Sequence, residues 1–150
     1  AGLFYRAFVN EKLLRYNFAR LDYQNLLVLV PGNFQAQLGL ALLNEKDKHY
    51  TEAYDGINSL IEQYPDSAMA YAARGGMEKE RGMLELAEFD YAKAMELDAG
   101  NEDFAFNHVD ILILLGRKDE AYRDLKKLLD AGCQPGRLQG FYARLKKKKK

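Results

Sequence analysis

The sequence has a single cysteine, Cys133, and no long hydrophobic run. One thiol excludes an internal disulfide framework and a cysteine-rich zinc site. It favours a reducing cytoplasm and is also compatible with an exported chain whose signal has been removed. The longest apolar runs, 26–30 and 111–115, are far too short to cross a bilayer. The chain opens with Ala-Gly instead of methionine and shows no secretory signal, so we expect a fragment or a processed product.

The sequence also lacks a net charge, with 22 basic and 22 acidic residues. Five of the lysines are consecutive, at 146–150, and removing these five leaves 17 basic residues and a net charge of −5. That sign provides no broad field to attract nucleic acid or an anionic membrane, so we expect neither as a partner. A terminal lysine run without aromatics is typical of a disordered end, or of a sequence artefact.

The sequence does contain an internal repeat. Alanine recurs at intervals of 34 residues, at Ala19, Ala53, Ala87 and Ala121. Large, mostly apolar residues follow at four, seven and eight positions, as Tyr23, Leu26 and Leu27 follow the first alanine. These steps place the side chains on one stripe of an α-helix, and such a stripe must be buried. Each alanine is therefore predicted to lie in a packed helix.

Stop and start signals divide the repeats from one another. Pro31 and Pro65 each stand twelve residues after an alanine, where a proline ends a helix. Asn33, Ser67 and Asn101 come two positions after this point, and their side chains can accept a backbone N–H as helix N-caps. The stretches beginning at 31, 65 and 99 therefore predict the end of one helix, a turn and the start of the next.

A second turn divides each repeat into two helices. Gly82 and Gly116 lie five residues before an alanine and mark a tight turn, while Lys48 takes that place in the second repeat. Thr51 is interpreted as an N-cap after the turn at 48. No period-2 alternation occurs, so the predicted fold is all-α. The predicted helices are 2–14, 17–30, 34–46, 51–64, 68–81, 85–98, 102–115 and 118–131.

The 34-residue helix–turn–helix unit resembles the tetratricopeptide repeat (TPR) family. The third unit is the most similar, with Tyr71, Gly75, Ala87, Tyr91 and Ala94 at the places where the family has aromatic or small residues. The resemblance implies an α-α superhelix, a solenoid of about four repeats that share one core. The predicted repeats are about 1–33, 34–67, 68–101 and 102–133.

The segment 134–147 is predicted to close this solenoid. Pro135 can open a helix, and Leu138, Phe141, Tyr142 and Leu145 follow it at helical spacing. We expect a capping helix over 136–147, apolar toward the fourth repeat and polar outward. The same residues could also be the first helix of a truncated fifth repeat.

No pattern of catalytic or metal-binding residues occurs. His49 and His108 have no metal-ligand spacing relative to other histidines or glutamates. Cys133 has no neighbouring motif that would activate a nucleophile, and Ser59, Ser67 and Thr51 do not lie in nucleophile turns. We therefore expect no enzyme activity, no cofactor and no metal.

The resemblance instead implies a groove for a partner. In TPR proteins the first helix of each repeat lines a concave groove. Carried onto this sequence, the groove residues are Phe4, Phe8, Glu11, Gln35, Leu38, Leu42, Glu45, Met69, Lys79, Asp103, Phe106 and Asp110. The alternative for Phe4, Leu38 and Phe106 is a place in the core.

These residues favour a protein or peptide partner. Some TPR proteins bind a C-terminal carboxylate with polar groove residues. The residues at the places of such a clamp are apolar here: Phe4, Phe8, Leu38 and Leu42. We expect an extended or helical peptide with apolar anchors, and with basic flanks that meet Asp103 and Asp110. The alternatives are a structural domain that self-associates into a homo-oligomer, and a regulatory fragment of a larger protein.

Overall fold

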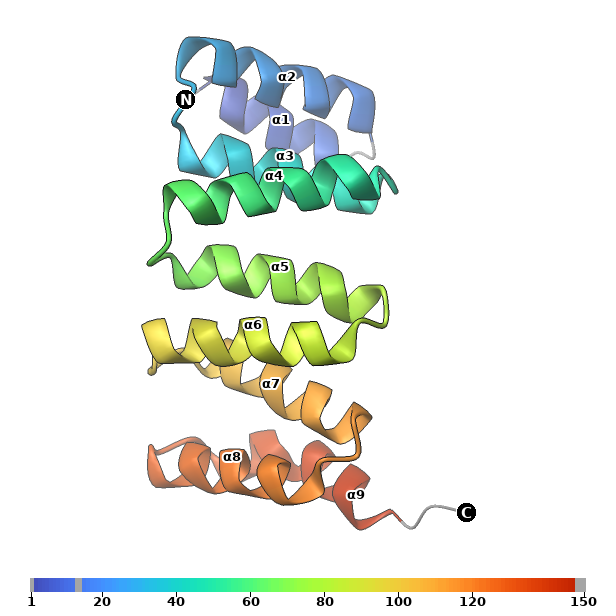
Figure 1. Cartoon of the computed structure of the whole chain (residues 1–150), viewed down its shortest axis with the longest axis vertical. Helices are drawn as coiled ribbons and strands as arrows, with labels where there is room; N and C mark the ends of the chain where they lie inside the picture. The colour runs from blue at the N-terminus through green and yellow to red at the C-terminus, as the bar shows by residue number, and fades with distance from the viewer. Residues whose placement is uncertain (1, 13–14, 148–150) are drawn as a thin grey trace. The chain divides into compact units, whose positions relative to one another are not determined.

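The computed structural model describes residues 2–12 and 15–147, which form two compact units, Ala1–Arg74 and Gly75–Lys150. In the first unit, α1 (Gly2–Lys12), α2 (Tyr16–Leu29), α3 (Phe34–Lys46) and α4 (Tyr50–Gln63) follow one another (Figure 1). Sequential helices of this unit pack together. The unit boundary falls within α5 (Ala68–Glu80). The end of the predicted helix 2–14, residues 13 and 14, lies outside the described residues.

The second unit continues with α6 (Leu84–Leu97), α7 (Glu102–Leu114) and α8 (Lys118–Asp130). A short 3₁₀ turn, η1 (Pro135–Leu138), leads into α9 (Gln139–Lys146). No strand occurs in the described residues, which confirms the all-α fold class. In this part of the chain no helix is long and apolar enough to span a membrane.

The alanine repeat has the predicted structural role. Ala19, Ala53, Ala87 and Ala121 lie in the second helix of each pair and all have 0% exposure. Their small side chains allow the two helices of a pair to approach closely where a larger residue would separate them. Gly75 makes a similarly close approach, because a Cβ built on it would lie 2.8 Å from the Tyr91 ring.

The turns inside the second, third and fourth helix pairs share one backbone conformation. Gly82 and Gly116 have φ values of 77° and 76°, as their sequence positions predicted. Lys48, at the equivalent place, has the same left-handed conformation, with a φ of 63°. The turn is therefore a property of the repeat, and in the second pair it forms without glycine.

The helix N-caps are confirmed at three places and wrong at one. The side chains of Asn33, Ser67 and Asn101 accept hydrogen bonds from the backbone N–H three residues later. Thr51 is not an N-cap, because α4 begins at Tyr50 and the N-cap residue is His49. The helix starts one residue before the predicted start at 51, because the left-handed residue Lys48 already reverses the chain.

The second unit has a hydrophobic core that α9 closes. Leu138 and Leu145 are buried in one cluster with Leu125 and Leu128 of α8. Phe141 packs against the same cluster, so the apolar face of the capping helix is turned inward, as predicted. The α-helix begins at Gln139 rather than at 136, because the residues after Pro135 form the 3₁₀ turn. Of the lysine run, 148–150 lie outside the described residues.

Candidate functional site

In the first unit, the most exposed apolar candidate on α1 is Phe8, with 46% exposure. The ammonium group of Lys12 lies 5.2 Å from the centre of its ring. Phe4, one turn earlier, is half-buried and contacts the ring of Tyr23 edge-on, with 6.1 Å between the ring centres. Phe8 therefore presents an exposed aromatic surface, whereas Phe4 belongs largely to the core.

Glu11 connects the first helices of the first two pairs. Its carboxylate accepts hydrogen bonds from the ammonium group of Lys46 in α3 and, at 3.3 Å, from the hydroxyl of Tyr23 in α2. Burial raises the pKa of Tyr23 to about 12, and the nearby Glu11 charge adds to this. Glu11 therefore has partners inside the protein, and it connects α1, the helix that carries Phe8, to α2 and α3.

The remaining candidates of this unit differ in exposure. Gln35 of α3 is exposed, Leu42 is half-buried, and Met69 of α5 has 52% exposure. Leu38 and Glu45 are buried, with only 6% and 8% exposure, so they contribute little surface to a ligand. On α3, the candidate residues that reach the surface are therefore Gln35 and Leu42.

In the second unit, Asp110 of α7 is paired within the protein. Its carboxylate lies 2.5 Å from the ammonium group of Lys79 and 2.5 Å from the guanidinium group of Arg144. Burial alone would raise the pKa of Asp110, but hydrogen bonds from these two cations outweigh burial and lower it. Asp103, two turns earlier, is exposed. Of these two carboxylates, Asp103 is therefore the exposed one.

Phe106 is covered by the capping segment. The guanidinium group of Arg137 lies 4.8 Å from the centre of its ring, and the ring centre of Phe141 lies 6.0 Å away. The side chain packs against the core cluster of the second unit and is half-buried. Its position agrees with the alternative interpretation, a place at the edge of the core.

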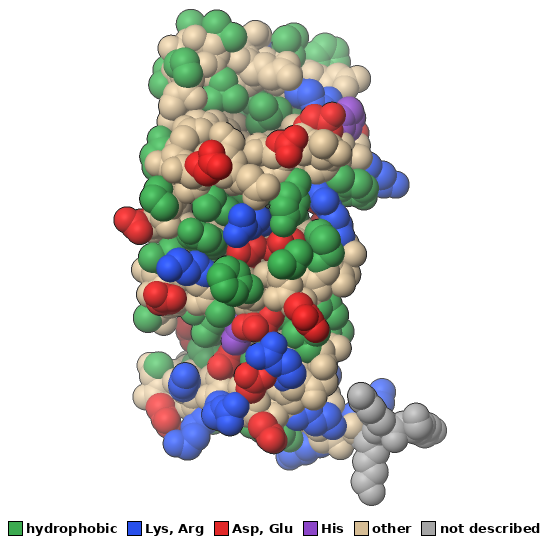
Figure 2. Space-filling model, in the orientation of Figure 1, with side chains coloured by type: hydrophobic (Ala, Val, Ile, Leu, Met, Phe, Trp, Pro, Cys, Tyr) green, Lys and Arg blue, Asp and Glu red, His purple; other side chains and the backbone are tan. Residues whose placement is uncertain are grey.

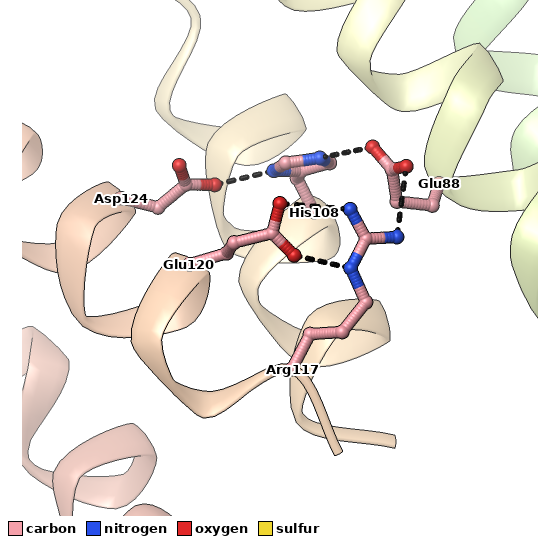
Figure 3. Close-up of polar contacts among 5 residues, drawn as sticks. All are labelled: Glu88, His108, Arg117, Glu120 and Asp124. Atoms are coloured by element: carbon pink, nitrogen blue, oxygen red, sulfur yellow. Dashed lines mark hydrogen bonds and ion pairs between the residues drawn. The ribbon is translucent and has the colours of Figure 1, made fainter. Parts of the chain in front are cut away.

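A buried polar cluster in the second unit was not predicted from the sequence. His108 of α7, with 8% exposure, lies between Asp124 of α8 and Glu88 of α6 (Figure 3). Its Nδ1 hydrogen-bonds Asp124, and its Nε2 lies 2.8 Å from Oε2 of Glu88. Arg117 extends the cluster, since it donates to Glu88 at 3.1 Å and to Glu120 at 2.9 Å.

The electrostatics of this cluster favour a charged histidine. Burial alone would lower the pKa of His108, but the hydrogen bonds and charges of Asp124 and Glu88 outweigh it and raise the pKa. A protonated ring donates from both nitrogens, which matches two carboxylate acceptors on opposite sides. The cluster therefore joins three helices and leaves neither ring nitrogen available for acid–base catalysis.

Cys133 is equally unsuited to chemistry. It is buried, with 7% exposure, and lies beside the carboxylate of Glu102. Burial raises the pKa of its thiol, and Glu102 raises it further, so the nucleophilic thiolate is disfavoured. Within residues 2–12 and 15–147, no group of histidine, cysteine and carboxylate side chains is arranged to hold a metal ion.

Comparisons with known proteins give the fold. No protein-family model and no curated protein matches the sequence. Among solved structures, MamA 41-end from Desulfovibrio magneticus RS-1 is 20% identical with a TM-score of 0.72, covering 85% of this chain and 72% of that chain. TTC0263, a thermophilic TPR protein of Thermus thermophilus, is 20% identical with a TM-score of 0.72, covering 96% and 79%.

This chain has the TPR fold. A further TPR structure, the first TPR of Spaghetti (RPAP3) bound to the HSP90 peptide SRMEEVD, is 22% identical with a TM-score of 0.67. That match covers 76% of this chain and 90% of the other. The TPR resemblance noted in the sequence is therefore confirmed at the level of the fold.

Proposed function

We propose that this TPR chain is a non-catalytic protein-interaction module that binds a peptide on the first helices of its repeats. The observation that carries the proposal is the ring of Phe8 on α1, which is 46% exposed. An exposed aromatic residue framed by charged groups is typical of a binding anchor. A peptide complex of another TPR structure supports this class of function.

The ligand that fits these residues has apolar anchors. Phe8 and Leu42 provide apolar surface on α1 and α3, and Lys46, one turn after Leu42, already binds Glu11. An acidic peptide tail such as the one bound to Spaghetti would need cations that are free to receive carboxylates. In the second unit, Lys79 is likewise paired with Asp110. The exposed Asp103 favours a basic residue in the ligand's flank.

Two fluorescently labelled peptides test the proposal by anisotropy. One carries leucine and phenylalanine anchors at helical spacing with lysines at its ends, and the other is SRMEEVD. We expect tighter binding of the apolar peptide, and at least about tenfold weaker binding after Phe8→Glu with Leu42→Glu.

The matched control adds the same two charges to helix α4, on positions outside the proposed site, Thr51 and Ser59. Thr51→Glu with Ser59→Glu is expected to leave binding unchanged. A preference for SRMEEVD, or equal losses in both double variants, would contradict the proposed site. Circular dichroism of each variant separates a lost site from a lost fold.

A further inference from the structure

The exposed face of α2 carries an apolar stripe that the proposed peptide site does not use. Its members are Phe18, Leu21, Val28 and Leu29, with exposed fractions of 63%, 52%, 79% and 70%. Figure 2 shows hydrophobic side chains gathered over the region that α2 occupies in Figure 1. Apolar groups exposed together on one helix mark a surface that another molecule covers. We call these four residues the α2 stripe.

The α2 stripe is arranged symmetrically about Asn25. At about 100° per residue, all four side chains project within about 60° of the direction of Asn25 around the helix axis. Along the axis, Phe18 and Leu21 precede Asn25, while Val28 and Leu29 follow it. Asn25 is itself exposed, and it lies at the centre of the stripe both along the helix axis and around it.

The same places in α4 are polar. Residues 34 positions after the stripe are Glu52, Asp55, Glu62 and Gln63, and all four are exposed. They remain exposed although α4 follows another helix pair in the same unit. Another repeat stacked before α1 would therefore leave the α2 stripe uncovered as well. The stripe is a lateral surface and not an unfinished end of the repeat stack.

Charge indicates which molecule covers it. Between 16 and 32 the charged side chains are Arg20 and Asp22. Arg20 is bound to Asn44 and Asp47, and Asp22 is 3% exposed and bound to Arg6. Within α2 itself the exposed face thus carries no free charge, and the exposed Arg15, which lines a pocket with Phe18 and Leu21, stands just before the N-terminal end of the helix, so two antiparallel copies place their Arg15 side chains at opposite ends. Two such faces can meet without placing like charges together.

We infer that a second copy of this chain pairs with α2 in an antiparallel arrangement, with the twofold axis passing beside Asn25. A twofold interface requires a surface that complements itself, and the stripe's apolar halves on either side of Asn25 satisfy this. Phe18 and Leu21 of one copy would face Val28 and Leu29 of the other. The two Asn25 amides would hydrogen-bond across the axis and fix the register. This pairing is independent of the peptide site.

Sedimentation of the whole chain from about 1 µM to about 0.2 mM tests the inference, a range in which a dimer held by one helix pair is populated. We expect a concentration-dependent dimer that becomes a monomer on Phe18→Glu with Leu21→Glu. The matched control is Leu86→Glu with Phe89→Glu, at the same two places in α6, where both residues are exposed apolar side chains. The control is expected to stay dimeric, because Glu96 already interrupts that face.

A crosslink tests the axis itself. Asn25→Cys is made in a Cys133→Ser background and oxidised, with Ser59→Cys at the same place in α4 as the control. Two cysteines on the axis come within disulfide reach, so only the Asn25→Cys chain is expected to form a covalent dimer. A wild-type monomer at every concentration would overturn the inference. So would a dimer that survives Phe18→Glu with Leu21→Glu, or equal crosslinking by the two cysteines.

Discussion

His108 and Asp124, which lie 16 residues apart, are hydrogen-bonded between α7 and α8. The same separation joins Arg6 of α1 to Asp22 of α2, where the guanidinium Nη2 lies 2.7 Å from the carboxylate. Both pairs occupy equivalent places in their repeats. A basic side chain on the first helix and an aspartate on the second thus join the two helices in two of the pairs. In the second pair these places hold Leu40 and Gly56.

The hydrogen bonds of His108 are expected to make the stability of the fold depend on pH. Because the folded-state pKa of His108 is raised, its contribution is fully present below the unfolded-state pKa of about 6.5 and is lost as the pH rises through the folded-state value. His108→Gln should therefore lower the free energy of unfolding by about 1–3 kcal/mol at about pH 6. The loss should be smaller at about pH 9.

Urea unfolding of both proteins at the two pH values measures this difference. Asp124→Asn serves as a second variant, because it removes the negative charge of one acceptor of the protonated ring while leaving His108 in place. It should also cost more at the lower pH. An equal loss at both pH values would show that His108 contributes only by packing.

Replacing glycine with alanine is predicted to have opposite effects on stability at two places: at Gly39, which lies close to Tyr23, and at Gly56. A Cβ on Gly39 would lie 2.6 Å from Cε1 of Tyr23, a residue that is only 2% exposed and is packed in the core cluster of the first unit. Gly39→Ala should therefore destabilise the fold by about 1–3 kcal/mol. In α4, a Cβ on Gly56 would make an ordinary 3.5 Å contact with Ala41.

Gly56→Ala should stabilise the fold by about 0.5–1 kcal/mol, because alanine favours the helix more than glycine does. Thermal unfolding of the two variants beside the parent chain measures both changes. Shifts of the same sign would mean that the Tyr23 ring yields, and that the close approach at Gly39 is not a constraint.

The register of the repeat can be tested at Ala87. Its side chain has 0% exposure, so Ala87→Leu should overpack the contact between α6 and the preceding helix segment. The free energy of unfolding should fall by about 1–3 kcal/mol. Glu85→Leu, an exposed position on the same helix, is the matched control. Chemical denaturation should show a loss for the first variant alone. An undiminished stability of Ala87→Leu would contradict the register.

Local signals explain why most of the fold was predictable. The buried alanines, the asparagine and serine N-caps and the turns at Gly82 and Gly116 each depend on residues within a few positions of one another. The 34-residue spacing then made these signals reinforce each other. The start of α4 was misplaced because Lys48 gives no sequence sign of a left-handed conformation.

The candidate site was harder to predict because it depends on long-range contacts. The sequence left Leu38 open between the groove and the core, and only the packing of the folded chain, which leaves it 6% exposed, decides between the two. The pairing of Asp110 with Lys79 and Arg144 joins residues far apart in the chain, beyond any local pattern. The sequence did contain one signal for the His108 cluster: Asp22 and Asp124 occupy the same position of their 34-residue repeats.

The left-handed turn at Lys48 predicts a stabilising substitution. Its φ of 63° matches those of Gly82 and Gly116, and the following N–H donates to Asn44 O at 2.8 Å, as Met83 N–H does to Glu78 O. A residue with a Cβ pays about 1–2 kcal/mol for this conformation, while glycine adds less than that in unfolded-chain entropy. Lys48→Gly should therefore raise the free energy of unfolding by roughly 0.5–1 kcal/mol.

The reciprocal variant makes this test independent of side-chain packing. A Cβ on Gly82 would meet no atom within 4 Å, so Gly82→Lys changes the backbone preference without a clash. It should lower the free energy of unfolding by a similar amount, measured by urea denaturation of both variants. Because the two turns share one geometry, the two changes should be opposite in sign. A Lys48→Gly chain no more stable than its parent would mean that side-chain contacts of Lys48 offset the backbone cost.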